Sequence, residues 1–317
     1  MQNLDQPENG IAKHLGQLIQ PSRYPGIIYE LRPNFSAIFQ NVLVKTNIQG
    51  FRMGPLSSIK GKNTVRIVGL GDSHMFGWGV PQEKMYMNVL ENTLNAKFPQ
   101  KKWEVINTGV PGYNTYMEIE TLSKKALMYD PDIVIMEFIG NDLDLPNFLM
   151  ESPDCFSVTR SFFLDFLKLK IKRIEAEVGL VSAPLELKEG ANGVCGPVGI
   201  QDLRKVPTRY RDMCGFPAFQ KAMIKLKKMQ EKKNFEVVIC FSQDLSMETG
   251  HNLVELCKRL KFHVLIDILT NAPSLVLSKV DLHPNELGHK QKAEALAGFI
   301  ISEKVIDKYI YAGRFKV

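Results

Sequence analysis

The sequence has no apolar run long enough to cross a membrane. Its longest apolar runs, at 133–139 and 237–241, have the length of buried strands and fall far short of the roughly 18 residues that a spanning helix needs. The first ten residues also lack the basic and then apolar regions of a secretion signal. We therefore expect no transmembrane span, and the lack of a signal or anchor favours a cytoplasmic protein.

Cysteine is scarce, with five residues in 317. No two cysteines have the spacing of metal ligands, so we expect no metal and no cofactor. Cys240 and Cys257 fall on apolar patterns, which predicts that both are buried. Cys155, Cys195 and Cys214 lie in a less regular region, where a disulfide would require an exported protein.

A strong charge of one sign is also missing. Forty basic residues against 34 acidic ones give a net charge of +6 that is spread over a large surface. The lysine-rich stretch at 221–233 is interleaved with apolar residues, as is typical of the solvated face of an amphipathic helix. We expect no nucleic-acid partner. The composition, 44% hydrophobic and 23% charged, is that of a globular protein and excludes a disordered or collagen-like chain.

The sequence does contain a regular alternation of strand and helix patterns from Thr64 onward. Such alternation predicts an α/β fold with a five-stranded, parallel, doubly wound sheet and helices on both faces. The strands are expected at 64–71, 104–110, 132–140, 236–241 and 263–268, and the helices at 84–98, 115–129, 219–232, 247–260 and 286–306.

Two parts of the chain stand outside this alternation. Residues 1–62 carry proline and glycine punctuation with short alternating runs, which predicts an irregular, partly β lead-in segment. Residues 143–215 show no strand pattern of comparable quality. We therefore divide the chain into a lead-in segment, 1–62, and a domain, 63–317, with an insertion at 143–215.

Unusual polar residues and glycines follow the predicted strands. Ser73 comes after the first strand, Gly112 after the second, Asn141 after the third, and His283 precedes the last helix. Because ligands bind at the carboxyl ends of the strands in such sheets, these residues are expected to meet at one edge.

Residues of these types suit acyl transfer. Ser73 needs a base to become a nucleophile, and His283 is the candidate base, with Asp281 as the carboxylate that orients it. An oxyanion needs donors already in place, and the candidates are the backbone N–H groups of Ser73 and Gly112 and the side-chain amide of Asn141. His74, Asp72, Asp142, Asn285 and His289 are interpreted as structural residues near the site.

The four blocks Gly-Asp-Ser, Gly, Gly-Asn-Asp and His-Pro-Asn, in this order, resemble those of the SGNH (GDSL-type) hydrolase superfamily, and in particular its bacterial esterase-like members. The resemblance runs from about Thr64 to Ile306, outside the insertion. It implies a flavodoxin-like three-layer fold and metal-independent esterase, lipase or carbohydrate deacetylase activity. Ser73 would be the nucleophile, Gly112 and Asn141 the oxyanion partners, and His283 the base, with Gly109 as a second candidate for the glycine.

The chain departs from this family in one respect. The family aspartate stands three residues before the histidine, where this sequence has Val280, and Asp281 stands two before. Two alternatives follow: Asp281 still reaches the imidazole, or the site works as a Ser-His dyad.

The sequence thus predicts a serine-dependent ester hydrolase that removes O-acyl groups from a carbohydrate or a small ester. An O-acyltransferase with the same Ser-His site and a non-catalytic glycan-binding module remain as alternatives. Related bacterial proteins often act on envelope glycans, so envelope association is the alternative to the cytoplasm. The oligomeric state is left open.

A different class of function, dinucleotide binding, is weakly indicated. Gly69 and Gly71 lie at the end of the first predicted strand, and Glu91 lies about 20 residues further on, as the nucleotide fingerprint expects. The third glycine position holds His74, whose side chain would crowd the approach of helix to strand. That hypothesis also leaves Asn141 and His283 without a role.

Overall fold

The protein is built around a parallel five-stranded sheet. The computed structural model describes residues 7–150, 187–189, 206, 208–242, 248–267 and 272–311. The strand order is β11-β10-β7-β5-β6, and every neighbouring pair is parallel, which confirms the predicted α/β class. The strands are β5 (Thr64–Leu70), β6 (Lys102–Asn107), β7 (Ile133–Phe138), β10 (Glu236–Phe241) and β11 (His263–Ile266).

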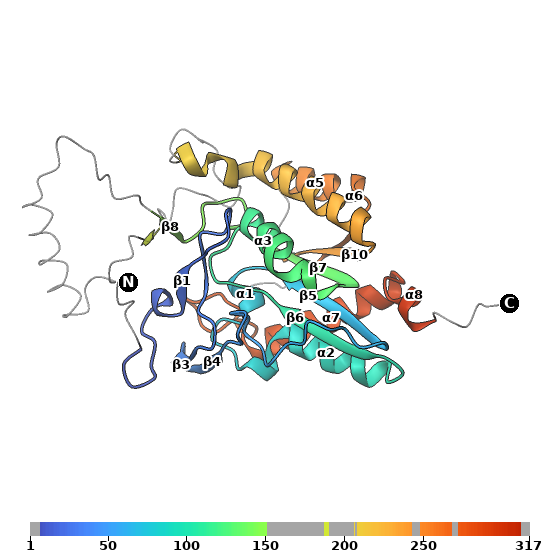
Figure 1. Ribbon diagram of the computed structural model, residues 1–317, viewed down its shortest axis with the longest axis horizontal. Helices are drawn as coiled ribbons and strands as arrows, with labels where there is room; N and C mark the ends of the chain where they lie inside the picture. Colours follow the sequence, from blue (N-terminus) through green and yellow to red (C-terminus); the bar gives the residue numbers. More distant parts are fainter. Residues whose placement is uncertain are drawn as a thin grey trace, which may run out of the picture.

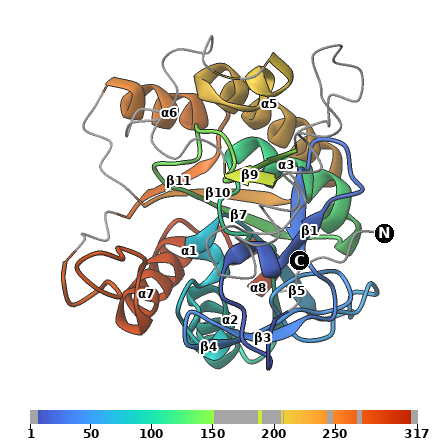
Figure 2. The ribbon, with the colours of Figure 1, turned by 90° about the vertical axis from the view of Figure 1, so that its left-hand side faces the viewer.

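Helices cover both faces of the sheet, as Figure 1 and Figure 2 show. Strand β5 explains why: Val65 and Ile67 pack in the cluster beneath α2 and α7, while Val68 and Leu70 pack toward α3, α5 and α6. A strand that is apolar on both sides needs cover on both sides. The helices of the first layer are α2 (Tyr86–Lys97) and α7 (Glu286–Ser302), and those of the second are α3 (Thr115–Thr121), α5 (Gly215–Lys233) and α6 (Glu248–Arg259).

Short elements complete the described chain. Helix α1 (Ser73–Phe76) follows β5 directly, and α8 (Asp307–Ile310) follows α7. The 3-10 elements are η1 (Leu15–Gln17), η2 (Gln82–Lys84), η4 (Leu127–Tyr129) and η6 (Thr208–Met213), and η3 (Leu122–Ala126) is a π-helical segment.

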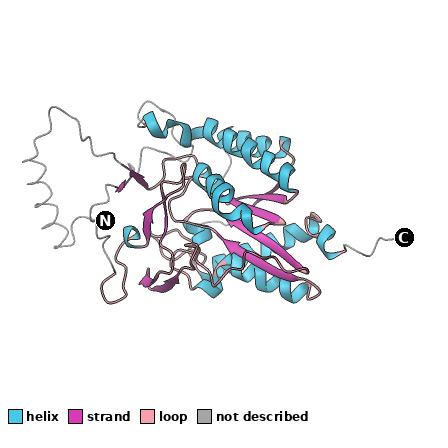
Figure 3. Cartoon of the chain, in the orientation of Figure 1, coloured by secondary structure: helices cyan, strands magenta, loops and turns pink. Residues whose placement is uncertain are grey.

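The lead-in segment is partly β, as expected. It contains the antiparallel pairs β1 (Ile19–Pro21) with β2 (Tyr29–Leu31) and β3 (Ser36–Phe39) with β4 (Val42–Lys45), which Figure 3 shows apart from the main sheet. Tyr29 ties this segment to the loop after β6, because its hydroxyl donates to the Pro111 carbonyl at 2.9 Å. The boundary at residue 62 stays a prediction.

The predicted insertion is described only in part. Its β8 (Phe148–Met150) pairs antiparallel with β9 (Leu187–Glu189). Cys155 and Cys195 lie outside the described residues, whereas Cys214, Cys240 and Cys257 are buried and free.

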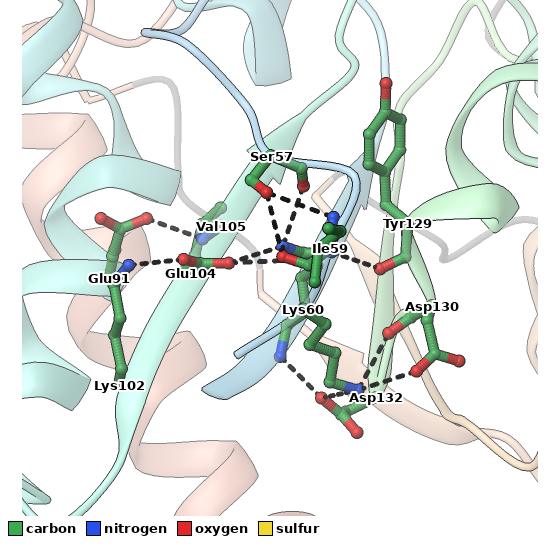
Figure 4. Close-up of polar contacts among 11 residues, drawn as sticks. Ser57, Ile59, Lys60, Glu91, Lys102, Glu104, Val105, Tyr129, Asp130 and Asp132 are labelled. Atoms are coloured by element: carbon green, nitrogen blue, oxygen red, sulfur yellow. Dashed lines mark hydrogen bonds and ion pairs between the residues drawn. The ribbon is translucent and has the colours of Figure 1, made fainter. Parts of the chain in front are cut away.

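A buried arginine joins four segments at the amino-terminal edge of the sheet, opposite the site. Arg66, the third residue of β5, is fully buried. Its guanidinium donates to Glu104 at 3.0 Å and to the carbonyls of Tyr129 at 2.7 Å and Ser57 at 3.0 Å. Figure 4 shows these partners, together with Lys60, which forms ion pairs with Asp130 and Asp132.

Replacement of this arginine tests how much its buried hydrogen bonds contribute to the stability of the fold. Arg66→Leu should lower the free energy of unfolding by about 3 kcal/mol, because it leaves buried acceptors without their donors. Equilibrium urea unfolding measures the loss. Lys102→Ala is the control, since it removes an exposed partner of the same Glu104 carboxylate and should cost less than about 1 kcal/mol. Equal losses in the two variants would contradict this account.

Candidate functional site

The turn after β5 presents Ser73 at the first position of a helix. Asp72 is the N-cap of α1, and its Oδ1 accepts from the His74 backbone N–H at 3.0 Å. The helix ends after one turn because Gly77 adopts a left-handed conformation with φ of +80°. Ser73 itself is 8% exposed, at the carboxyl end of β5 and next to the ends of β6 and β7.

Three of the predicted site residues form one chain of hydrogen bonds. His283 Nε2 lies 2.8 Å from Ser73 Oγ, although 210 residues separate the two in sequence. On the other side of the ring, Nδ1 lies 2.6 Å from Asp281 Oδ1. A carboxylate only accepts, so Nδ1 carries the proton and Nε2 is left to accept from the serine hydroxyl.

The turn before α7 explains how Asp281 reaches the imidazole from two residues away. Ser278 Oγ accepts from the Asp281 backbone N–H at 3.0 Å, and the Ser278 N–H donates back to the Asp281 carbonyl at 3.0 Å. In this tight turn Asp281 Oδ1 also accepts from the His283 backbone N–H at 3.1 Å. Val280, at the position of the family aspartate, is 95% exposed.

The next residues anchor that turn to the helix. Asn285 caps α7 by accepting from the N–H groups of Leu287 and Gly288, as predicted, and its amide donates to the carbonyls of Ser274 and Val276. The hydrogen bonds from His283 hold the pKa of Asp281 below its ordinary value against the opposing effect of burial, so the carboxylate is charged at neutral pH.

The ring of Trp78, which the sequence did not indicate as part of the site, stacks on His283. Trp78 lies 5.1 Å from the His283 ring, centroid to centroid, with an interplanar angle of 17°. It stands between Gly77 and Gly79, both with positive φ, in a turn that side-chain-bearing residues rarely adopt. In the sequence, the two glycines that flank this tryptophan are the feature that could have indicated the turn. The stacked indole can stabilise the ring when it is protonated.

Asn141, one of the expected oxyanion donors, is joined to the serine turn through Asp72. Asn141 Nδ2 donates to Asp72 Oδ2 at 3.1 Å, and the same oxygen lies 3.1 Å from Ser73 Oγ. This contact uses one amide hydrogen of Asn141 and leaves the other. Within the described residues, neither the Ser73 amide nor the Gly112 amide has an acceptor.

The two candidate glycines have different surroundings. Gly109 packs against the backbone of Met75 and Phe76, where a Cβ would clash, and its amide donates to Asn107 Oδ1 at 2.9 Å. Gly112 has φ of +74°, and a Cβ there would collide with the side chain of Asn147. Gly109 therefore serves helix packing, and Gly112 is the better candidate donor.

Two buried carboxyl groups lie behind the Asn141 loop. Asp142 Oδ2 accepts from the Ile139 N–H at 2.5 Å, which holds the loop after β7 as the sequence suggests. Glu118 on α3 is 1% exposed. Burial raises the pKa values of both Glu118 and Asp142 well above their ordinary values, and the negative charge of Asp72 raises both further. The negative charge of Asp142 also raises the pKa of Glu118.

The described residues contain no group of three or more His, Cys, Asp or Glu side chains arranged to hold a metal ion. Within the same part of the chain, no helix combines the length and the apolarity that a bilayer crossing requires.

No family model and no curated protein sequence matches the chain. Similar solved structures include a two-domain esterase active on acetylated mannans, with 14% identity and a TM-score of 0.45 over 76% of this chain and 49% of that one. A lipase/acylhydrolase from Enterococcus faecalis has 14% identity and a TM-score of 0.42 over 75% and 96% of the two chains. An acetyl xylan esterase has 15% identity and a TM-score of 0.40 over 74% and 98%.

The matched part thus spans about half of the two-domain esterase.

The buried acids give a pH-dependent stability that can be measured. A carboxyl group whose pKa is raised by folding stabilises the folded state below about pH 4, and that contribution is lost as pH rises through the folded pKa. Urea unfolding should therefore show stability falling above this range. Glu118→Gln removes one of the two charges and should flatten the fall, whereas Glu303→Gln, at an exposed carboxylate, should not. An unchanged slope in Glu118→Gln would contradict the raised pKa.

Proposed function

We propose that the protein is a serine esterase that removes acyl groups through an acyl-enzyme. The observation that carries the proposal is the continuous chain Ser73 Oγ, His283 Nε2, His283 Nδ1, Asp281 Oδ1, with contacts of 2.8 Å and 2.6 Å. Nucleophile, base and orienting carboxylate in this order are the geometry that acyl transfer requires.

In the first half of the reaction, His283 Nε2 takes the proton of the Ser73 hydroxyl while Oγ attacks the ester carbonyl carbon. The carbonyl oxygen becomes an oxyanion, and the amides of Ser73 and Gly112 and the side chain of Asn141 are its proposed donors. Asp281 stabilises the imidazolium that forms. His283 then protonates the leaving alcohol as the carbon–oxygen bond of the ester breaks.

In the second half, water replaces the alcohol. His283 takes a proton from the water, which attacks the acyl carbon, and the Ser73 Oγ–acyl bond breaks as the serine regains its proton. The products are a carboxylic acid and the free enzyme. The proposed substrates are O-acylated carbohydrates or other small esters, as the four sequence blocks imply.

Asp281→Asn tests the role of the carboxylate. The asparagine amide donates toward Nδ1 and favours the tautomer with the proton on Nε2, which cannot accept from Ser73. We expect kcat for p-nitrophenyl acetate to fall on the order of 10²–10⁴-fold. Ser73→Ala is the reference for complete loss.

The same assay decides between the triad and the dyad. A loss of less than about tenfold in Asp281→Asn would show that the imidazole works without this carboxylate, although Ser73 would remain the nucleophile. Activity retained in Ser73→Ala would overturn the proposed function as a whole.

A further inference from the structure

A buried charge cluster that the proposed mechanism does not use lies beside the site. Glu137, in β7, and Lys292, in α7, are each 1% exposed. Lys292 Nζ donates to Glu137 Oε1 and, at 2.6 Å, to Ser242 Oγ. The Tyr86 hydroxyl donates to Glu137 Oε2 at 2.7 Å. Removing the two charges of such a pair from water costs free energy, so its position beside the site suggests a functional role.

The cluster faces one residue of the site. His74 Nδ1 lies 3.4 Å from Glu137 Oε1, and it is buried without a hydrogen bond. The His74 side chain is 21% exposed, so the ring turns Nδ1 inward and leaves Nε2 as the nitrogen that a ligand can reach. The His74 ring lies 5.5 Å from the ring of His283, at an interplanar angle of 66°. Two imidazoles are thus adjacent, and each has its Nδ1 beside a carboxylate.

The charge state of Glu137 fixes the tautomer of His74. Burial alone would raise the pKa of Glu137, but the positive charge of Lys292 and the contact with His74 hold it below its ordinary value. Glu137 is therefore a negatively charged carboxylate, and its charge favours the tautomer in which the nitrogen that faces it, Nδ1, carries the proton. In the neutral ring Nε2 then has a free lone pair and can accept a hydrogen bond.

We propose that His74 is a specificity-determining residue that accepts a hydrogen bond, through Nε2, from a hydroxyl group of the alcohol portion of the substrate. This inference rests on the proposed function and narrows its substrate class to esters of polyhydroxy alcohols. His283 protonates the ester oxygen of the leaving alcohol. The neighbouring oxygen of a vicinal diol is only three bonds away from that oxygen, so one substrate can contact both rings.

The test compares two esters with the same acyl group and a three-carbon alcohol. Glycerol monoacetate carries hydroxyl groups beside the ester, and propyl acetate carries none. Acid release in a pH-stat gives kcat/KM for each. The wild-type protein should prefer glycerol monoacetate, and His74→Phe should lower the ratio of the two kcat/KM values about tenfold, which is the effect of one good hydrogen bond.

Two further variants separate recognition from a structural role. His74→Gln retains an acceptor near the position of Nε2 and should keep most of the wild-type ratio. His251→Phe, the same substitution at an exposed position of α6, should leave the ratio unchanged. The double variant Glu137→Gln/Lys292→Met removes the charges together, and its ratio should fall because the His74 tautomer is released.

The outcomes are distinguishable. Hydrolysis of both esters with the same ratio in wild type and His74→Phe would overturn the inference and leave the proposed function intact. Hydrolysis of neither ester, nor of p-nitrophenyl acetate, by the folded wild-type protein would overturn both.

Discussion

One carboxylate, that of Asp72, joins the two loops on which the site depends. It is 2% exposed. Its Oδ1 accepts from the His74 amide, and its Oδ2 lies 3.1 Å from both Ser73 Oγ and Asn141 Nδ2. Because β5 and β7 are parallel neighbours, the turn that bears Ser73 and the loop that bears Asn141 begin at the same edge. The hydrogen bonds of Asp72 fix the positions of these two loops. One holds the first turn of α1, and the other orients the side-chain amide of Asn141.

The lead-in segment supplies a second set of constraints. Arg52, fully buried, donates to the carbonyls of Phe76, Gly77 and Val80, which lie at and just beyond the carboxyl end of α1. Burial lowers the pKa of Arg52 to about 10, which still leaves it charged at neutral pH. Phe39 of β3 packs edge-on against Trp78 at 4.9 Å. Since Trp78 stacks on His283, residues far upstream of the nucleophile buttress both the serine and the histidine.

Much of the fold was readable from the sequence because its signals are local. The alternation of strand and helix patterns along the chain predicted the five strands and their parallel direction. The Asn285 cap follows from the type of one side chain. Element ends were less exact: the helix expected at 115–129 is α-helical only over Thr115–Thr121 and continues as the π turn and 3-10 turn of η3 and η4. The backbone hydrogen bonds that end a helix depend on packing as well as on periodicity.

The parts of the site that the sequence left open depend on contacts between distant residues. Whether Asp281 reaches His283 is decided by hydrogen bonds within the Ser278 turn, which no spacing rule encodes. Glu137 looks in sequence like an interruption of an apolar strand. Its partner Lys292 is 155 residues away, so nothing local marks the two as a pair.

Covalent labelling tests most directly whether Ser73 is a nucleophile activated by His283. A fluorophosphonate reacts with an activated serine and remains attached, so intact mass followed by peptide mapping gives both the number of adducts and their position. We expect one adduct, on Ser73, in the wild-type protein and none in Ser73→Ala. An adduct on another residue, or a folded wild-type protein that does not react, would contradict it.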